Sequence, residues 1–112
     1  MLNFYADERV YSTLHDLTGI PGARVAFGDK KPKCPRFLYR LREGGEVVAD
    51  GLNYAAMPKY TARLYLSDYD SDTVAAFARA VSSIGPYTYD EEWSDEDGGK
   101  YVAVFDFTVC KD

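Results

Sequence analysis

The residues of this 112-residue sequence that are best suited to chemistry are a single histidine and two clusters of acids. A histidine that acts as a general base needs a nucleophile to activate, and no serine or cysteine motif accompanies His15. We therefore expect His15 to be a solvated residue on a helix. Residues 68–72 (Asp-Tyr-Asp-Ser-Asp) match the start of a calcium-binding loop, but Thr73 and Arg79 stand where such a loop needs glycine and glutamate. We expect these aspartates to form a turn and to begin a helix.

The second acidic cluster covers residues 90–97, and its six acids are Asp90, Glu91, Glu92, Asp95, Glu96 and Asp97. Such a segment would bind divalent cations only weakly, so we expect a solvated hairpin loop or a negative patch that meets a basic partner. The glycine pairs at 44–45 and 98–99 lack the spacing and the following Lys-Ser or Lys-Thr of a phosphate-binding loop. No zinc-ligand spacing, nucleophile elbow or dinucleotide fingerprint is present. The sequence therefore offers no support for an enzyme, a metal site or a cofactor.

The elements that would position these residues belong to one domain, residues 1–112. A composition of 46% hydrophobic and 28% charged residues predicts a globular chain with one modest core. A net charge of −5 argues against nucleic-acid binding through clustered Lys and Arg, and against an anionic membrane surface. No run approaches the ~18 apolar residues of a membrane span, and the N-terminus lacks a signal-peptide pattern. We expect a cytosolic protein in which Cys34 and Cys110 are free thiols, with a disulfide as the alternative.

The hydrophobic pattern predicts two helices. Residues 3–18 carry an apolar stripe of Val10, Leu14 and Leu17, and Gly19 is placed to end this helix. Residues 71–83 carry the clearest amphipathic pattern, in which Val74, Phe77, Val81 and Ile84 repeat at helical spacing.

The strands are predicted at residues 24–27, 36–43 and 59–66, from Tyr87 into the acidic cluster, and at 100–110. Residues 44–57 form a turn-rich excursion between two of them. The element order is α-β-β-β-α-β-β. It predicts an α+β, two-layer sandwich in which two helices cover one face of a mainly antiparallel sheet of four to five strands.

Several short segments follow one another in an order and spacing that resembles a known family. They are residues 17–21 (Leu-Thr-Gly-Ile-Pro), 35–39 (Pro-Arg-Phe-Leu-Tyr), 49–54 (Ala-Asp-Gly-Leu-Asn-Tyr), 64–68 (Leu-Tyr-Leu-Ser-Asp) and the aromatic strand 101–109. The chain resembles, over nearly its whole length, the small head–tail joining proteins of long-tailed bacteriophages and prophages. These are labelled tail terminator, tail completion or minor capsid proteins.

The resemblance implies a structural protein of the virion, with an α+β fold, no enzymatic activity and no cofactor. Such proteins form a ring, typically a hexamer, at the head-proximal end of the tail, and some are monomers when free. The implied partners are copies of the chain, the tail tube protein and the head connector proteins, with no sequence-specific nucleic acid and no membrane. Before assembly the protein would be in the host cytoplasm.

A closed ring needs two different contact patches on each subunit. One candidate is the half-apolar second face of the sheet, with Leu38, Tyr65, Val102 and Val104. Another is an arm formed by the 44–57 excursion, with Val47, Val48, Leu52, Tyr54 and Met57. The acidic cluster would line a lumen through which DNA passes without binding, because like charges repel each other. Alternatively, intrachain loops cover the apolar face and the arm is an ordinary hairpin.

Two other classes of function are consistent with the sequence. The first is an acidic protein-binding module, such as an inhibitor that mimics nucleic acid with its Asp and Glu side chains. The second is a small enzyme or ligand-binding domain, which would need a pocket with converging polar groups.

Overall fold

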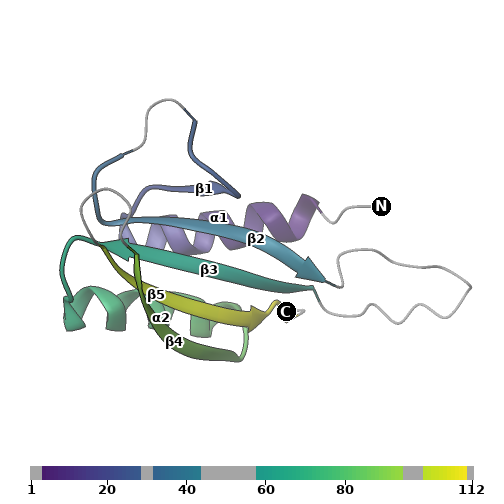
Figure 1. Cartoon of the computed structure of the whole chain (residues 1–112). Helices are drawn as coiled ribbons and strands as arrows, with labels where there is room; N and C mark the ends of the chain where they lie inside the picture. The colour runs from purple at the N-terminus through teal and green to yellow at the C-terminus, as the bar shows by residue number, and fades with distance from the viewer. Residues whose placement is uncertain (1–3, 29–31, 44–57, 95–99, 111–112) are drawn as a thin grey trace, which may run out of the picture.

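The computed structural model of the protein describes residues 4–28, 32–43, 58–94 and 100–110. Its elements are α1 (Phe4–Thr18), β1 (Gly22–Arg24), β2 (Arg36–Glu43), β3 (Lys59–Leu66), α2 (Ser71–Ile84), β4 (Tyr87–Ser94) and β5 (Lys100–Thr108). Five strands form one sheet, and both helices lie behind it in the view of Figure 1. The predicted α+β class and the order α-β-β-β-α-β-β are therefore confirmed.

The strands lie in the order β1-β2-β3-β5-β4. The β2–β3, β3–β5 and β5–β4 pairs are antiparallel, whereas the short β1 runs parallel to β2. The last strand of the five, β5, therefore lies between β3 and the edge strand β4 (Figure 1).

The first strand was predicted at the wrong residues. Residues 24–27 look like a strand because Val25, Ala26 and Phe27 are apolar, but β1 ends at Arg24 and Val25 has a φ of 71°. The strand begins at Gly22, where an added Cβ would lie only 2.2–2.4 Å from ring atoms of Phe37. Only a residue without a side chain allows β1 to approach β2 this closely.

The helix α1 covers the β2 side of the sheet with Val10 and Leu14, which are fully buried. Leu17, predicted to share this stripe, is instead 63% exposed. The helix ends one residue later, and Gly19 adopts a φ of +72°, which directs the chain back toward the sheet. Ile20 then supplies the buried side chain at this end of the helix, so Leu17 is not needed in the core.

The helix α2 begins as expected from its aspartates. The carboxylate of Asp70 accepts hydrogen bonds from the backbone N–H groups of Asp72 and Thr73, at 3.1 and 3.3 Å. The hydrogen bonds from Thr73 and Asp72 lower the pKa of this carboxyl group. The aspartates therefore cap a helix, as predicted from the missing glycine and glutamate of a calcium loop.

The core lies between the two helices and one face of the sheet. Its centre is a chain of aromatic rings, with centroids 5.4 Å apart for Phe37 and Phe77 and 5.3 Å apart for Phe77 and Phe105. Burial of side chains this large contributes about 1.5–3 kcal/mol each, so this layer dominates the stability of the fold. Cys34 and Cys110 are free, half-buried thiols. Among the helices described, none is long and apolar enough to cross a membrane.

Candidate functional site

The face of the sheet opposite the helices, which we call the open face, carries a regular array of side chains. No described helix covers it (Figure 1). The strand register aligns them in three rows across β2, β3, β5 and β4. The rows are Arg36–Tyr65–Val102–Glu92, Leu38–Arg63–Val104–Asp90 and Arg40–Thr61–Asp106–Thr88.

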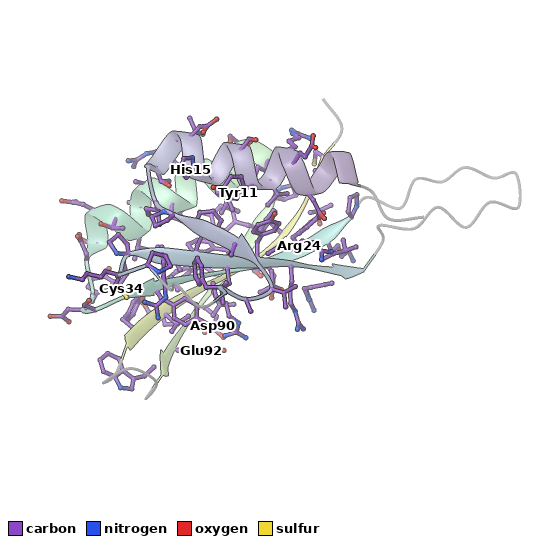
Figure 2. The ribbon with its side chains drawn as sticks, turned by 90° about the horizontal axis from the view of Figure 1, so that it is seen from above. Tyr11, His15, Arg24, Cys34, Asp90 and Glu92 are labelled. Atoms are coloured by element: carbon purple, nitrogen blue, oxygen red, sulfur yellow. The ribbon has the colours of Figure 1, made fainter. Side chains whose placement is uncertain are left out.

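Charge is separated across this face. Among the residues whose side chains the structure describes, the cations are on β2 and β3 and the carboxylates are on β5 and β4; they are Arg36, Arg40, Arg42, Lys59 and Arg63 against Asp90, Glu92 and Asp106. Figure 2 shows Asp90 and Glu92 on the opposite side of the sheet from Tyr11 and His15 of α1. One face of one sheet therefore presents a basic side and an acidic side.

The middle of the open face is neutralised by ion pairs within the subunit. Arg63 of β3 reaches across β5 to the carboxylate of Glu92 on β4. Asp106 accepts a 2.6 Å hydrogen bond from the Thr61 hydroxyl and lies 3.7 Å from a guanidinium nitrogen of Arg42. Toward the two sides of the face, some charged side chains form no ion pair with another described residue.

Arg40 and Asp90 are the clearest such residues. Both are exposed, and neither forms an ion pair with any residue that the structure describes. Among the described residues, the Asp90 carboxylate accepts a hydrogen bond only from the neighbouring backbone N–H of Glu91, at 2.8 Å. These two opposite charges lie on the same face, one on β2 and the other on β4, and are therefore available to another molecule.

The four apolar residues predicted for a contact on this face are largely covered within the subunit. Val102 and Val104 are only 2% and 8% exposed, because the Arg63–Glu92 pair spans the strand that carries them. Leu38 and Tyr65 are half-buried. A partner that approaches the open face therefore meets charged side chains before it meets apolar ones, and a role for these four residues in subunit contact stays a prediction.

The acidic cluster is not a loop over its first half. Asp90, Glu91 and Glu92 belong to β4, which is paired with β5 from Tyr87 to Ser94. The density of acids suggests a solvated loop. The acids alternate with Tyr89 and Trp93, however, and this alternation matches the two-residue period of a strand. The other residues predicted for the patch and the arm lie outside the described residues: Asp95, Glu96, Asp97, Val47, Val48, Leu52, Tyr54 and Met57.

The edge strand β4 also exposes aromatic side chains on its helix-side face. Tyr87, Tyr89 and Trp93 are 39%, 41% and 63% exposed, and they pair in register with the core residues Phe107, Phe105 and Tyr101. The helices leave this side of the sheet uncovered. The alternation of Tyr87, Tyr89 and Trp93 with acids is the sequence signal for an exposed edge strand.

A hydrogen-bonded cluster holds these aromatics in place. Glu91 accepts hydrogen bonds from the hydroxyl groups of Tyr89, at 3.0 Å, and Tyr101, at 2.6 Å. The ring of Tyr69, which is exposed, meets the ring of Tyr101 edge-on at 5.0 Å. Burial, followed by the bonds to Glu91 and Tyr89, raises the pKa of Tyr101. These hydroxyl groups therefore stay protonated and serve as structural donors.

Two hollows lined by described residues indent the open face. One, of about 240 Å³, is lined by Val25, Leu38, Tyr39, Arg40, Thr61, Arg63 and Tyr65. The other, of about 360 Å³, is lined by Arg42, Lys59, Pro86, Tyr87, Thr88, Asp106, Phe107 and Thr108. The first combines an apolar floor with two guanidinium groups, so it suits a side chain or segment that is partly apolar and partly acidic.

The described residues contain no group of three or more His, Cys, Asp and Glu side chains that would hold a metal ion. No family model matches the sequence, and no curated protein matches it at a significant level. We therefore infer function from the surface of the subunit.

Proposed function

We propose that the protein is a structural subunit of virion assembly, a tail terminator or head–tail joining protein of a long-tailed phage or prophage. In this role, copies of the chain form a ring, most simply a hexamer, at the head-proximal end of the tail. The ring stops growth of the tail tube and offers a surface to the head connector. The partners would be other copies, the tail tube protein and the connector proteins, and no cofactor would be needed.

The observation that carries this proposal is the unequal covering of the sheet. One face is packed under two helices, whereas the open face and the β4 edge expose charged and aromatic groups. Tyr and Trp are enriched where proteins bind one another, because they combine a large apolar surface with a polar group. The eight-residue β4 also has no partner strand among the described residues along one of its sides, so backbone groups on that side are left for another chain. These features support a role in contacts between proteins.

The distribution of charge bears on the alternative, an inhibitor that mimics nucleic acid. A mimic would present a broad surface of one sign to a basic enzyme. Here Asp90 and Glu92 share the open face with Arg40, Arg42 and Arg63. A surface with both signs favours assembly over mimicry.

Deletion of the gene from an inducible phage or prophage that carries it tests the proposal. We expect overlong tails or unjoined heads and tails in negative-stain micrographs, and recovery when the protein is supplied from a plasmid. The matched control is a plasmid that encodes Gly28→Ala, because an added Cβ at Gly28 would meet nothing within 4 Å. Virions with tails of normal length and normal attachment in the deletion strain would rule the proposal out.

A further inference from the structure

We infer that β4 is a docking edge for an extended segment of another protein, in which Lys or Arg residues alternate with apolar residues. The segment would lie beside β4 and extend the sheet by one strand. The inference goes beyond the proposed function, because it identifies the chemistry of a partner from β4 alone, whichever assembly the protein belongs to.

The first observation is that β4 is open on both faces and along one side. Every residue from Tyr87 to Trp93 is exposed, and among the described strands only β5 pairs with β4 (Figure 1). The register with β5 is continuous, with no bulge of the kind that turns an edge away from a partner. β4 is therefore a long and regular edge, whereas β1, at the other side of the sheet, has three residues.

The β4–β5 ladder shows which backbone groups face the free side of β4. The N–H of Thr108 donates to the carbonyl oxygen of Pro86 at 3.1 Å, so these two residues form a hydrogen-bonded pair. Such pairs alternate along an antiparallel ladder, so the backbone groups of the odd-numbered residues 87–93 point away from β5. The N–H of Glu91 agrees with this direction, because it donates to the carboxylate of Asp90. A strand from another protein would pair with these groups.

The two faces of β4 favour different side chains on that strand. On the helix-side face, Tyr89 and Trp93 are 41% and 63% exposed, and apolar residues of an adjacent strand would pack beside them. On the open face, Asp90 forms no ion pair with a described residue, and Glu92 pairs with Arg63. Lys or Arg is favoured next to these two carboxylates. Because successive side chains of a strand point to opposite faces, the segment alternates basic and apolar residues.

The aromatic side chains of β4 are held in place within the subunit. The ring centroids of Tyr87 and Tyr89 lie 5.7 and 5.2 Å from that of Phe105, and Glu91 accepts hydrogen bonds from the hydroxyl groups of Tyr89 and Tyr101. Side chains that are ordered before binding lose less conformational entropy on binding.

Protection of the edge against aggregation does not explain these aromatic residues. Charged side chains are the usual protection of an edge strand, and the acids of β4 would serve that purpose. Exposed aromatic residues have the opposite effect, because they favour pairing with another strand. Their presence beside the acids indicates an edge that excludes most strands and accepts a basic one.

A segment of another protein fits this edge better than other occupants. Antiparallel pairing of β4 with β4 of a second copy would bring the acids at 90–92 close to the same acids, which is destabilising. Residues 44–57, the longest stretch outside the described residues, contain Glu46 and Asp50 but no Lys or Arg. Nucleic acid is repelled by carboxylates. Only a basic segment has the complementary charge.

A designed peptide tests the inference on the full chain. The probe is acetyl-Arg-Val-Arg-Phe-Arg-Val-Arg-amide, and its control has Glu in place of every Arg. Amide exchange of the ¹⁵N-labelled protein is followed by NMR at low ionic strength. At saturation, the Arg peptide should slow exchange at the odd-numbered residues 87–93 by at least about tenfold, because their N–H groups become hydrogen-bonded. The even-numbered residues 88–92, which already pair with β5, should change little, and the Glu peptide should have no effect.

Backbone methylation of the peptide separates strand pairing from attraction between charges. One form carries N-methyl groups on its Arg residues and the other on its apolar residues. A strand that pairs along one side directs only alternate N–H groups toward its partner. One form should therefore lose binding while the other keeps it. Equal binding of the two forms would overturn the inference, because charge alone does not distinguish them.

Charge reversal locates the peptide on β4. Asp90→Lys should bind the Arg peptide at least about tenfold more weakly than wild type, because it places like charges in contact. Glu8→Lys is the matched control, since it makes the same change of charge at an exposed position of α1 and should bind as wild type. Circular dichroism establishes that both variants are folded, and Asp90→Asn, with a smaller expected loss, replaces Asp90→Lys if that variant is not.

Three further results would overturn the inference. They are equal affinity of the Asp90 and Glu8 variants for the Arg peptide, equal binding of the Arg and Glu peptides, and protection of the odd-numbered amides in the protein alone as its concentration rises. The last result would assign the edge to a strand of a second copy. None of these outcomes depends on the tails of the deletion strain, so the inference and the proposed function are tested separately.

Discussion

Tyr60 links the first helix to the middle of the sheet through its hydroxyl group. The side chain is fully buried, and its hydroxyl donates a hydrogen bond to Asp7 of α1. The other carboxylate oxygen of Asp7 lies 2.8 Å from Nε of Arg24, at the end of β1. Three elements therefore meet at one carboxylate, and the tyrosine is the buried member of the group.

Replacement of Tyr60 by Phe should lower the free energy of unfolding by about 1–2 kcal/mol, because Asp7 loses a donor in a partly buried position. Tyr11→Phe is the control, since Tyr11 makes ring contacts in the same layer and its hydroxyl forms no hydrogen bond with another described residue. Urea denaturation followed by circular dichroism measures both variants. Equal losses in the two would show that the hydroxyl of Tyr60 contributes nothing specific.

The same group predicts the response of the fold to alkali. Burial, and then the bond to Asp7, raises the pKa of Tyr60 above its ordinary value of 10.0. The unfolded chain releases this proton near pH 10 whereas the folded protein retains it, so stability is complete below about pH 10 and falls as the pH rises further. Tyr101 acts in the same direction. Urea midpoints measured from about pH 8 to pH 11 should fall less steeply in Tyr60→Phe than in wild type.

At the scale of elements, the join between α2 and β5 leaves no space for a side chain. The backbone N–H of Thr108 donates to Pro86 at 3.1 Å, and that of Cys110 donates to Ile84 at 3.1 Å. An added Cβ at Gly85 would lie 1.8 Å from the carbonyl oxygen of Thr108. Because that neighbour is backbone, it cannot move aside without a shift of the strand.

Gly85→Ala should therefore destabilise the protein by about 1–3 kcal/mol or more, the range for an overpacked core. Gly28→Ala is the matched control, because its new methyl group would enter open space. Thermal and urea denaturation of the two variants measures the difference. A Gly85→Ala protein as stable as the control would mean that α2 and β5 are not in such close contact.

The elements that could be predicted are those with a complete hydrophobic period. β2, β3 and α2 were located to within a residue or so because each carries a repeating apolar face. β1 could not be located, since a three-residue strand has no period and its position depends on the approach of Gly22 to the ring of Phe37, a residue distant in sequence.

The candidate site was harder to predict than the fold. The arginines at 36, 40 and 42 lie on one side of β2, but only the pairing of β3 with β5 and of β5 with β4 places them opposite Asp90 and Glu92. The central position of β5 is a property of the whole sheet, and the sequence carries no local sign of it. We therefore did not predict the charge separation of the open face, although the sequence contains every residue that takes part in it.

For the whole molecule, the sole tryptophan reports on any assembly contact made through the β4 edge, which the proposed function includes. Trp93 is 63% exposed on the β4 edge, so its fluorescence in dilute solution should be that of an indole in water. Association through β4 would remove water from the ring and shift the emission to shorter wavelength as protein concentration rises. The shift should disappear in high salt, which screens the charges. An emission maximum that is the same at all concentrations at which the protein sediments as an oligomer would place Trp93 outside the contact.

The place of β5 in the sheet has a consequence for how the protein is made. A ribosome synthesises β5 after the other four strands, yet this strand separates β3 from β4 and carries Phe105 at the centre of the aromatic layer. A nascent polypeptide that ends before residue 100 lacks the strand with which β4 pairs and against which α2 packs. Folding of this domain should therefore await the release of β5 from the exit tunnel.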